Sequence, residues 1–492
     1  MFNLRGNGRT SGERCRQEGE PLFAAHGGTG GSLTPIAITL LVKKPEYTGN
    51  AKIYYHDIGM YLKRKEKLGL LEKFKSIISP EVEQTSITPN KDGDWINKRS
   101  KVFETYIPIG DKKNTDTKTA FVPYYSRGCA SARDVWVYNF SKPELEKNIT
   151  SMIDFYNEKL GQAISGLEYD STRISWSDSL KQMLARNIEL HCEPKNYAIS
   201  MYRPFCKQNF CYYKPILERT YQMLRLFPTP QSKNLVICVP GIGSNKDFST
   251  IIVDCIPDIQ LQFNGQCFPL YWYEKRDTNG TLFDLGDEEY IRRDGISDFM
   301  LQRCRAEFGY KTTKEDVFYY VYGLFHSNCY RKKFAADLKK TLPRIPLVKE
   351  FWTFSKIGRE LAELHLNYEN LSKPKNVIVE GIGANDFVVD KLRFPSKEQR
   401  DTIIYNSKIK ISGIPNECYN YRVNGKSPLD WIMERYQKSI DESSKIANDP
   451  NKWISEHNNP KYVLNLLLSL MSVSLGTLKI MDSLPDIDTE LI

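Results

Sequence analysis

An apolar run at residues 36–42 constrains the fold more than any other part of this chain. The run is almost continuous and rich in β-branched residues, which is typical of a strand buried on both faces of an α/β sheet. A parallel sheet needs several such strands joined by crossover helices, and nothing precedes Phe2 to supply them. We therefore expect residues 1–110 to be the α/β end of a larger sheet that the chain does not complete.

Length, aromatic content and charge narrow the classes of protein that remain. A chain of 492 residues is too long for a single core and suggests roughly two to four domains. The 12% aromatic content favours a globular, β-containing protein over a disordered one. The formal charge is +9, and residues 1–76 carry 13 Lys or Arg against 7 Asp or Glu. This balance is compatible with a polyanionic partner, although a basic surface that is merely solvated is the alternative.

The cysteines and apolar segments indicate a reduced, cytoplasmic protein. The 11 cysteines include no Cys-x-x-Cys pair, and their closest groupings are Cys206 with Cys211 and Cys329 with His326. A zinc site would need a second pair at ligand spacing, so no metal site is predicted. The N-terminus does not resemble a signal peptide, and the most hydrophobic stretch, residues 462–475, is too short and too polar to span a bilayer. We expect no membrane partner.

Two Gly-Ile-Gly segments, at residues 241–243 and 381–383, are the candidates for a cofactor-binding loop. Such a loop should open a helix and be followed by an acidic residue about 20 positions later. Residues 249–254 instead have the composition of a strand, so the helix is missing after the first segment. We interpret both segments as tight β-turns, and their similar flanking residues indicate a weak internal duplication.

Four basic residues in two segments are candidates for nucleic-acid contact. Arg127 and Arg133 lie in a loop of small residues, which lets a guanidinium approach a phosphate or a guanine edge. The structural alternative pairs Arg133 with Asp134 or another nearby carboxylate, purely to hold the loop. Arg203 and Lys207 lie in a strand with alternating aromatic residues, where packing alone would explain most of the pattern.

A helix that ends at Pro343 is predicted to have two different faces. At about 100° per residue, one arc carries the apolar side chains of Tyr330, Phe334, Ala335, Leu338 and Leu342. The opposite arc carries Lys332, Lys333, Lys339 and Lys340, which suits a stripe that faces phosphates. A solvated lysine face is the alternative. Arg344 lies between Pro343 and Pro346 and is a candidate for a directed contact.

Other helices are predicted at residues 61–78, 143–163, 176–187, 354–368 and 461–480. The first should turn Leu62, Leu68, Leu71 and Phe74 inward and Lys63, Arg64, Lys65 and Lys67 outward. In the helix at 354–368, His365 borders the apolar stripe and is interpreted as a packed core residue. Ser427 followed by Pro428 and Asp430 predicts the capped start of a further helix.

Several motifs resemble one family, the type ISP restriction–modification enzymes, in which single polypeptides join nuclease, helicase, methyltransferase and target-recognition parts. Asn3-Leu-Arg-Gly-Asn7, residues 9–13, Gly28, residues 34–38 and Val42-Lys43 look like the region after the catalytic tetrapeptide of adenine-N6 methyltransferase domains. Residues 124–140, 314–346, 419–436 and 448–451 resemble the C-terminal recognition region. Ser131 departs from the pattern, because threonine is usual there. The resemblance runs from residue 2 nearly to the C-terminus.

The resemblance implies a Rossmann-like methyltransferase remnant at 1–110, followed by a mixed α+β target-recognition domain at 111–492 that divides near residue 310 into 111–310 and 311–492. It implies recognition of double-stranded DNA, for methylation or cleavage by a methyltransferase, helicase or nuclease portion encoded upstream. A further stretch, residues 201–213, is similar to one found in adenine-specific methyltransferases with attached recognition domains. The residues expected to contact DNA are the following basic ones: Arg5, Arg9, Arg127, Arg133, Arg203, Lys207, Lys332, Lys333, Lys339, Lys340 and Arg344.

Alternative functions are weighed against the motifs that they require. An active methyltransferase needs an Asn/Asp-Pro-Pro-Tyr/Phe loop for the flipped adenine, and neither Asn-Pro-Pro nor Asp-Pro-Pro occurs. We therefore expect no catalysis and no binding of S-adenosylmethionine by the chain alone. As a fragment of an active adenine-specific methyltransferase, it would regain activity only with an N-terminal partner. An unrelated hydrolase finds no support, since Gly-x-Ser-x-Gly and His-Glu-x-x-His are both absent.

Overall fold

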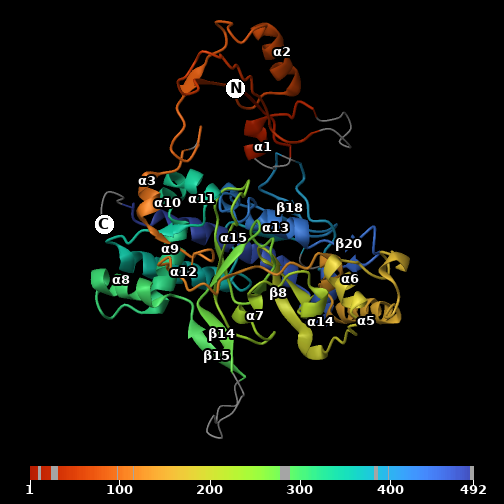
Figure 1. Cartoon of the computed structure of the whole chain (residues 1–492). Coiled ribbons are helices and arrows are strands. Elements are labelled where there is room, and N and C mark those ends of the chain that lie inside the picture. The colour runs from red at the N-terminus through yellow and green to blue at the C-terminus, as the bar shows by residue number, and fades with distance from the viewer. Residues whose placement is uncertain are drawn as a thin grey trace. The chain divides into compact units, whose positions relative to one another are not determined.

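A computed structural model describes residues 1–8, 13–23, 32–96, 98–114, 116–276, 289–381, 386–396 and 398–487. The chain forms two compact units, residues 1–99 and residues 100–492 (Figure 1). The sequence analysis set its division at residue 110. Both units mix helices with small sheets, which confirms the mixed α and β content expected from the sequence.

The first unit is built on a four-stranded sheet of order β2-β1-β3-β4. Strands β1 and β3 run parallel, whereas β2 and β4 are antiparallel to their neighbours. A small apolar core lies against the sheet and contains Phe2, Leu4, Leu22, Ile58 and Val82. The elements are β1 (Phe2–Arg5), α1 (Glu13–Glu18), β2 (Ile36–Ile38), β3 (Ile53–Asp57), α2 (Arg64–Phe74) and β4 (Thr85–Ile87).

The apolar run at 36–42 does not form a strand that is buried on both faces, so that prediction is wrong for this unit. Only Ile36–Ile38 is extended, and β2 is the outermost strand of its sheet. Leu41 and Val42 are 88% and 81% exposed. The strand ends at Ile38, so Leu41 and Val42 lie outside the sheet, and no described residue of the unit packs over them.

Helix α2 corrects the prediction that Lys67 faces solvent. Its side chain is fully buried, and its ammonium group donates hydrogen bonds to the carbonyl oxygens of Leu4 at 2.9 Å and Glu18 at 3.0 Å. Leu68, which was expected to face inward, is 43% exposed. Burial lowers the pKa of Lys67. Lys67 therefore occupies a buried position that periodicity would give to an apolar side chain, because backbone carbonyls of β1 and the end of α1 accept its hydrogen bonds.

Among its described residues, the second unit contains three small sheets and three two-stranded ribbons. The sheets have the orders β11-β10-β13-β6, β12-β8-β9-β7 and β17-β19-β18, and the ribbons are β14-β15, β16-β5 and β20-β21. The strands are β5 (Ile107–Pro108), β6 (Ser126–Arg127), β7 (Tyr138–Asn139), β8 (Tyr197–Arg203), β9 (Cys206–Cys211), β10 (Val236–Val239), β11 (Ile251–Val253), β12 (Ile256–Pro257), β13 (Gln266–Pro269), β14 (Tyr271–Lys275), β15 (Tyr290–Asp294), β16 (Arg344–Ile345), β17 (Ile378–Glu380), β18 (Ile403–Ile404), β19 (Lys410–Ser412), β20 (Ser439–Ile440) and β21 (Ala447–Asn448).

The helices of the second unit include long buried ones as well as surface ones (Figure 1). Their starts follow sequence signals: Ser427 accepts a hydrogen bond from the backbone N–H of Asp430 and completes the predicted cap. The helices are α3 (Lys101–Thr105), α4 (Asp134–Val137), α5 (Lys142–Glu158), α6 (Asp178–Ala185), α7 (Met223–Leu226), α8 (Asp298–Phe308), α9 (Lys314–His326), α10 (Asn328–Lys333), α11 (Ala335–Lys340), α12 (Phe351–Leu366), α13 (Pro428–Arg435), α14 (Pro450–Glu456) and α15 (Tyr462–Asp482).

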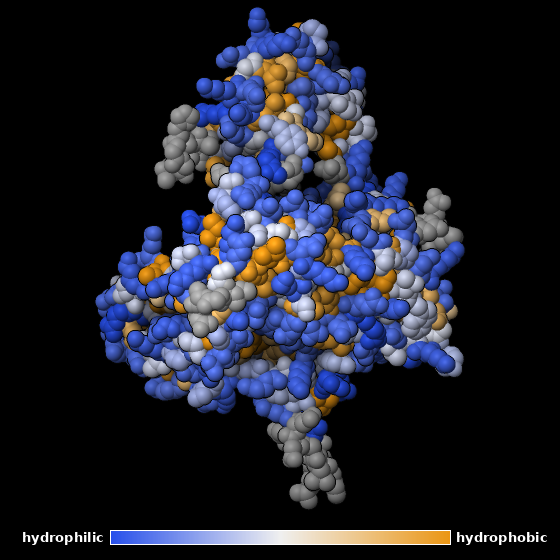
Figure 2. Space-filling view, turned by 180° about the vertical axis from the view of Figure 1, so that it is seen from behind, coloured by the Kyte–Doolittle hydropathy of each residue, from blue (hydrophilic) through white to orange (hydrophobic). Residues whose placement is uncertain are grey.

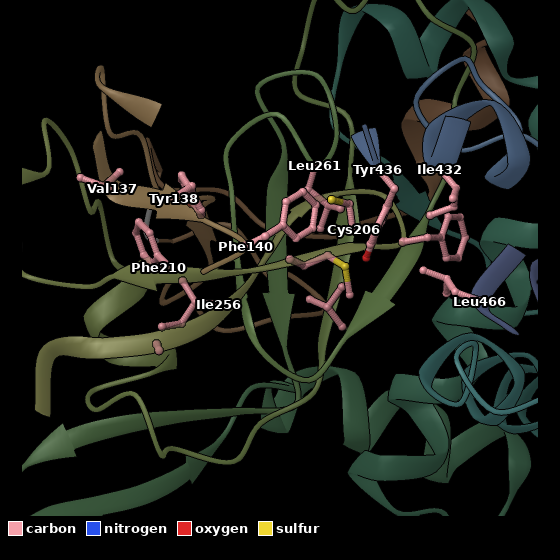
Figure 3. Close-up of a cluster of buried hydrophobic side chains, with 14 of the residues drawn as sticks. Val137, Tyr138, Phe140, Cys206, Phe210, Ile256, Leu261, Ile432, Tyr436 and Leu466 are labelled. Atoms are coloured by element: carbon pink, nitrogen blue, oxygen red, sulfur yellow. The ribbon is translucent and has the colours of Figure 1, made fainter. Parts of the chain in front are cut away.

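Two buried apolar clusters hold the second unit together. In the first, Tyr138 stacks on Phe210 with ring centroids 4.4 Å apart. Ile432 of α13, Tyr436 directly after α13 and Leu466 of α15 belong to the same core (Figure 3). The second cluster is centred on α9 and α12. His365 of α12 is buried between the Tyr322 hydroxyl at 2.6 Å and the Thr477 hydroxyl at 2.8 Å. The interpretation of His365 as a core residue is confirmed.

Helix α15 is longer than the apolar stretch recognised in the sequence. By length and composition alone it could cross a bilayer, which corrects the judgement that this stretch is too short and too polar. Most of its apolar window, 61%, is buried within the protein. Leu467 and Met471 lie fully inside the first cluster. The same test is met by core helices of soluble proteins, and the burial of α15 fits that explanation.

Candidate nucleic-acid interface

The predicted lysine-bearing helix is two short helices, α10 and α11, rather than one. They are separated at Phe334, whose φ of −105° and ψ of 22° depart from helical values. The Phe334 ring packs against Phe103 at 5.1 Å and Tyr106 at 5.6 Å. This tertiary packing outweighs continuation of the helix. Ala335, predicted to be inward, is consequently exposed, whereas Leu338 is buried as expected.

The break changes how the four lysines are presented. Lys332 and Lys333 are exposed, whereas Lys339 and Lys340 are half-buried. The Lys339 ammonium group lies 3.6 Å from a carboxylate oxygen of Asp247. All four belong to neighbouring turns of chain, so we call Lys332, Lys333, Lys339 and Lys340 the lysine surface. The structure thus keeps these cations together but does not arrange them as one uniform helical stripe.

The first Gly-Ile-Gly segment lies beside the lysine surface, since the Gly243 N–H donates to the Lys339 carbonyl at 2.9 Å. It is a turn between the antiparallel strands β10 and β11, as predicted, and opens no helix. A Cβ at Gly241 would lie 2.4 Å from the Asn264 carbonyl oxygen, and Gly243 has φ +83°. Both glycines are therefore required by the backbone. The second segment falls largely on residues 382–385, outside the described residues.

Arg127 is exposed on β6, as its proposed role requires. Its guanidinium lies 5.5 Å from the Tyr221 ring, and no carboxylate of the described residues forms an ion pair with it. Burial, together with the nearby Arg127 charge, lowers the pKa of Lys112 to about 8. Arg225 lies 4.8 Å from the ring of Tyr124. Lys112 and Arg225 were not predicted from the sequence, because only tertiary contacts bring them close to the segment 124–127.

Arg133 has the structural role that was its alternative in the sequence, but its partners are not the carboxylates expected there. The side chain is buried, and its guanidinium donates to the Ser175 carbonyl at 3.2 Å, the Ser177 hydroxyl at 2.6 Å and the Ile216 carbonyl. Burial lowers its pKa to about 10. The suggested ion pair with Asp134 is not formed, because the guanidinium N–H groups of Arg133 donate to two backbone carbonyls and the Ser177 hydroxyl instead. A phosphate could not reach this group in the folded chain.

Arg203 and Lys207 are likewise used inside the protein. Arg203 contacts the carboxylates of Asp258 at 2.5 Å and Asp134 at 3.1 Å. Burial raises the pKa of Asp258 to about 7, against the opposing attraction of Arg203. Lys207 pairs with Glu369 at 2.6 Å. These contacts satisfy both cations, so the expectation that they reach DNA loses its structural basis.

The remaining predicted residues are placed as follows. Arg344 donates to the carbonyl oxygens of Glu104 at 2.9 Å and Tyr106 at 3.0 Å, which ties β16 to the distant segment at the end of α3. In the first unit, Arg5 lies 2.6 Å from Asp57 and is only 17% exposed. Both arginines therefore stabilise local structure. Arg9 lies outside the described residues.

Comparisons with known proteins identify the family. The family model of the type ISP C-terminal specificity domain matches residues 120–466. A search of curated proteins found no match. The ATP-dependent type ISP restriction–modification enzyme LlaBIII bound to DNA has 38% sequence identity and a TM-score of 0.88, covering 99% of this chain and 31% of that chain.

Two further solved structures are similar. A nuclease-deletion mutant of the type ISP enzyme LlaGI, in complex with a DNA substrate mimic, has 37% identity and a TM-score of 0.84, covering 99% of this chain and 43% of that chain. The DrdV–DNA complex has 24% identity and a TM-score of 0.81, covering 98% of this chain and 47% of that chain, and shows likeness of fold. The chain spans less than half the length of each protein. Because the family model covers most of its residues, the chain belongs to the type ISP C-terminal specificity domain family.

Proposed function

We propose that this chain is the sequence-specific DNA-recognition part of a type ISP restriction–modification system. It would position double-stranded DNA for methylation or cleavage by portions of the system outside residues 1–492. The observation that carries the proposal is the specificity-domain match over residues 120–466. The DNA-bound state of LlaBIII and LlaGI, both above one-third identity, supports DNA as the ligand.

The first unit would be the end of an adenine-N6 methyltransferase domain. The motifs within residues 3–43 and the mixed sheet of this unit support that assignment. The exposure of Leu41 and Val42 also fits it, because an apolar segment that belongs to a larger sheet would be uncovered when its neighbours are supplied by other residues. A subunit that regains methyltransferase activity with an N-terminal partner is the second candidate function.

The lysine surface is the proposed site of phosphate contact, and Arg127 is the proposed directed contact. Replacing Lys332, Lys333, Lys339 and Lys340 together by Ala should flatten the log–log dependence of duplex affinity on salt. Each phosphate contact releases condensed counterions, so the slope should fall by about 0.9 per real contact. Fluorescence anisotropy with a duplex between low and physiological salt measures it. All sequences should weaken about equally.

The matched control removes the same charge from four exposed lysines on other elements, Lys147, Lys214, Lys452 and Lys479. This variant should keep the wild-type slope, because the change in net charge is identical and only the position differs. If both variants change the slope alike, or if neither does, the four lysines are a solvated face and do not contact phosphates.

Binding of the methyl donor is a separate expectation. The purified chain should give no saturable heat with S-adenosylmethionine in calorimetry at micromolar protein and should transfer no methyl group to DNA. The reason is that it contains no Asn-Pro-Pro or Asp-Pro-Pro loop, and its described Gly-Ile-Gly turn leads into a strand. Saturable binding would contradict the assignment of the catalytic portion to other residues.

A further inference from the structure

The turn at residues 241–247 presents an apolar side chain in basic surroundings. Ile242 is 60% exposed and stands between the two glycines of the Gly-Ile-Gly turn. Apolar side chains occur in many places on the surface of the molecule (Figure 2), so exposure alone does not distinguish this one. Its position does, because the same turn touches α11 of the lysine surface through the hydrogen bond from Gly243 to Lys339.

The backbone of this turn is held by contacts on both sides. The Gly241 N–H donates to the Phe263 carbonyl at 2.8 Å, and the lack of space at Gly241 fixes the approach of the chain. Strand β10, which leads into the turn, is fully buried. Ile242 therefore projects from a fixed support. A binding side chain on such a support loses little conformational freedom when it makes contact.

A second turn lies directly against the first. The Asn424 N–H donates to the Ser249 hydroxyl at 2.9 Å, and a Cβ at Gly425 would lie 2.9 Å from the Lys246 side chain. The minor groove of B-DNA is about 6 Å wide, whereas the major groove is about 12 Å wide and admits protein elements such as a two-stranded β-ribbon. There each thymine displays its C5-methyl group, the apolar feature among the base edges.

The charges around Ile242 favour a polyanion over a protein partner. The carbonyl oxygen of Lys339 accepts a hydrogen bond from the turn, Lys340 follows it at the end of α11, and Lys246 belongs to the turn. The acidic group of the turn, Asp247, is 83% exposed in its side chain and lies 3.6 Å from Lys339. An apolar side chain on a turn that carries Lys246 and contacts Lys339 matches DNA, in which apolar base edges lie between two rows of phosphates.

From these contacts we propose that Ile242 reads a thymine by apolar contact with its C5-methyl group in the major groove, while the lysine surface holds the flanking phosphates. This inference rests on the proposed DNA-recognition function and names a residue that determines its specificity. The proposed thymine contact does not involve Asn245, the polar residue three positions further along the same turn.

The test uses the full chain and duplexes selected from a random pool. The wild type should enrich a sequence with a thymine at one position that Ile242→Ser no longer enriches. Replacing that thymine by uracil, which lacks only the methyl group, should weaken wild-type binding about fourfold, as expected for one buried methyl-sized group. The same replacement should leave the affinity of Ile242→Ser unchanged, so residue and methyl group form a double-mutant cycle.

Ile440→Ser is the matched control, since Ile440 on β20 is 59% exposed. It should keep the uracil effect, and circular dichroism melting should show that both variants fold. Suppose that the wild type selects a sequence but that uracil weakens binding by the wild type and by Ile242→Ser equally, or weakens neither. The inference is then overturned and the proposed function stands. If the wild type selects no sequence at all, the proposed function fails together with the inference.

Discussion

Replacing Arg203 by Met is expected to lower the free energy of unfolding by about 3–5 kcal/mol at pH 8.5. The guanidinium lies 2.5 Å from Asp258, whose side chain is 1% exposed, and 3.1 Å from Asp134. Met fills much of the volume but leaves the two carboxylates without their cation. The cost comes from the uncompensated buried charge, because an intact pair of this kind adds little net stability by itself. Urea denaturation of the full chain measures the loss.

The destabilisation should depend on pH in a direction fixed by Asp258. Burial raises its pKa from 3.8 to about 7 in the folded protein, so the folded state binds an extra proton between these values. Stability therefore falls as pH rises through that window. Loss of the Arg203 charge raises the pKa of Asp258 further and extends the fall above pH 7. The difference between variant and wild type should accordingly be smaller at pH 6 than at pH 8.5.

Arg293→Met is the control for removing an arginine that is paired at the surface. Arg293 lies 3.3 Å from Glu274, and both side chains are about half exposed at 52% and 47%. Solvent screens such a pair, so the expected loss is below about 1 kcal/mol and shows no step near pH 7. An Arg203 effect no larger than this, or one independent of pH, would show that Asp258 does not depend on the Arg203 charge.

Three arginines show what the sequence could and could not predict. Arg127, Arg133 and Arg203 all lie in motifs that resemble recognition regions, and only Arg127 is exposed. The partners that bury the other two are distant in sequence: Ile216 is 83 residues from Arg133, and Asp258 is 55 residues from Arg203. Motif and spacing identified the segment. Whether each guanidinium is buried or exposed depends on tertiary contacts, and these cannot be read from a local sequence pattern.

Local signals were reliable where the determining contacts are themselves local. The cap formed by Ser427 and Asp430 spans three residues, and the Gly-Ile-Gly turn follows from the strands on either side. Periodicity correctly predicted that Tyr330, Phe334 and Leu338 are buried. It failed at the break between α10 and α11, because the position of the Phe334 ring is fixed by aromatic partners far away in the sequence. The prediction that Lys67 faces solvent failed for the same reason, since the carbonyl oxygens that accept its hydrogen bonds belong to other elements.

Gly358→Ala should be strongly destabilising, although alanine is the better helix former. Helices α9 and α12 meet through glycines, and a Cβ at Gly358 would lie 1.9 Å from the Tyr319 carbonyl oxygen. Backbone cannot move aside as a flexible side chain can, so the helices must separate. We expect a loss at or above the upper end of the roughly 1–3 kcal/mol seen for overpacked cores, measured by thermal and urea unfolding.

The opposite sign is expected at Gly69, which supplies the matched control. This glycine lies in α2, and a Cβ there would meet nothing within 4 Å. Gly69→Ala should therefore stabilise its unit by up to about 1 kcal/mol through helix propensity alone. Because α9 leads through Ser327 directly into α10, separation of α9 from α12 should also move the lysine surface. Gly358→Ala should thus weaken duplex binding while Gly69→Ala leaves it unchanged; unchanged stability and binding in both variants would show that the glycine contact does not support the interface.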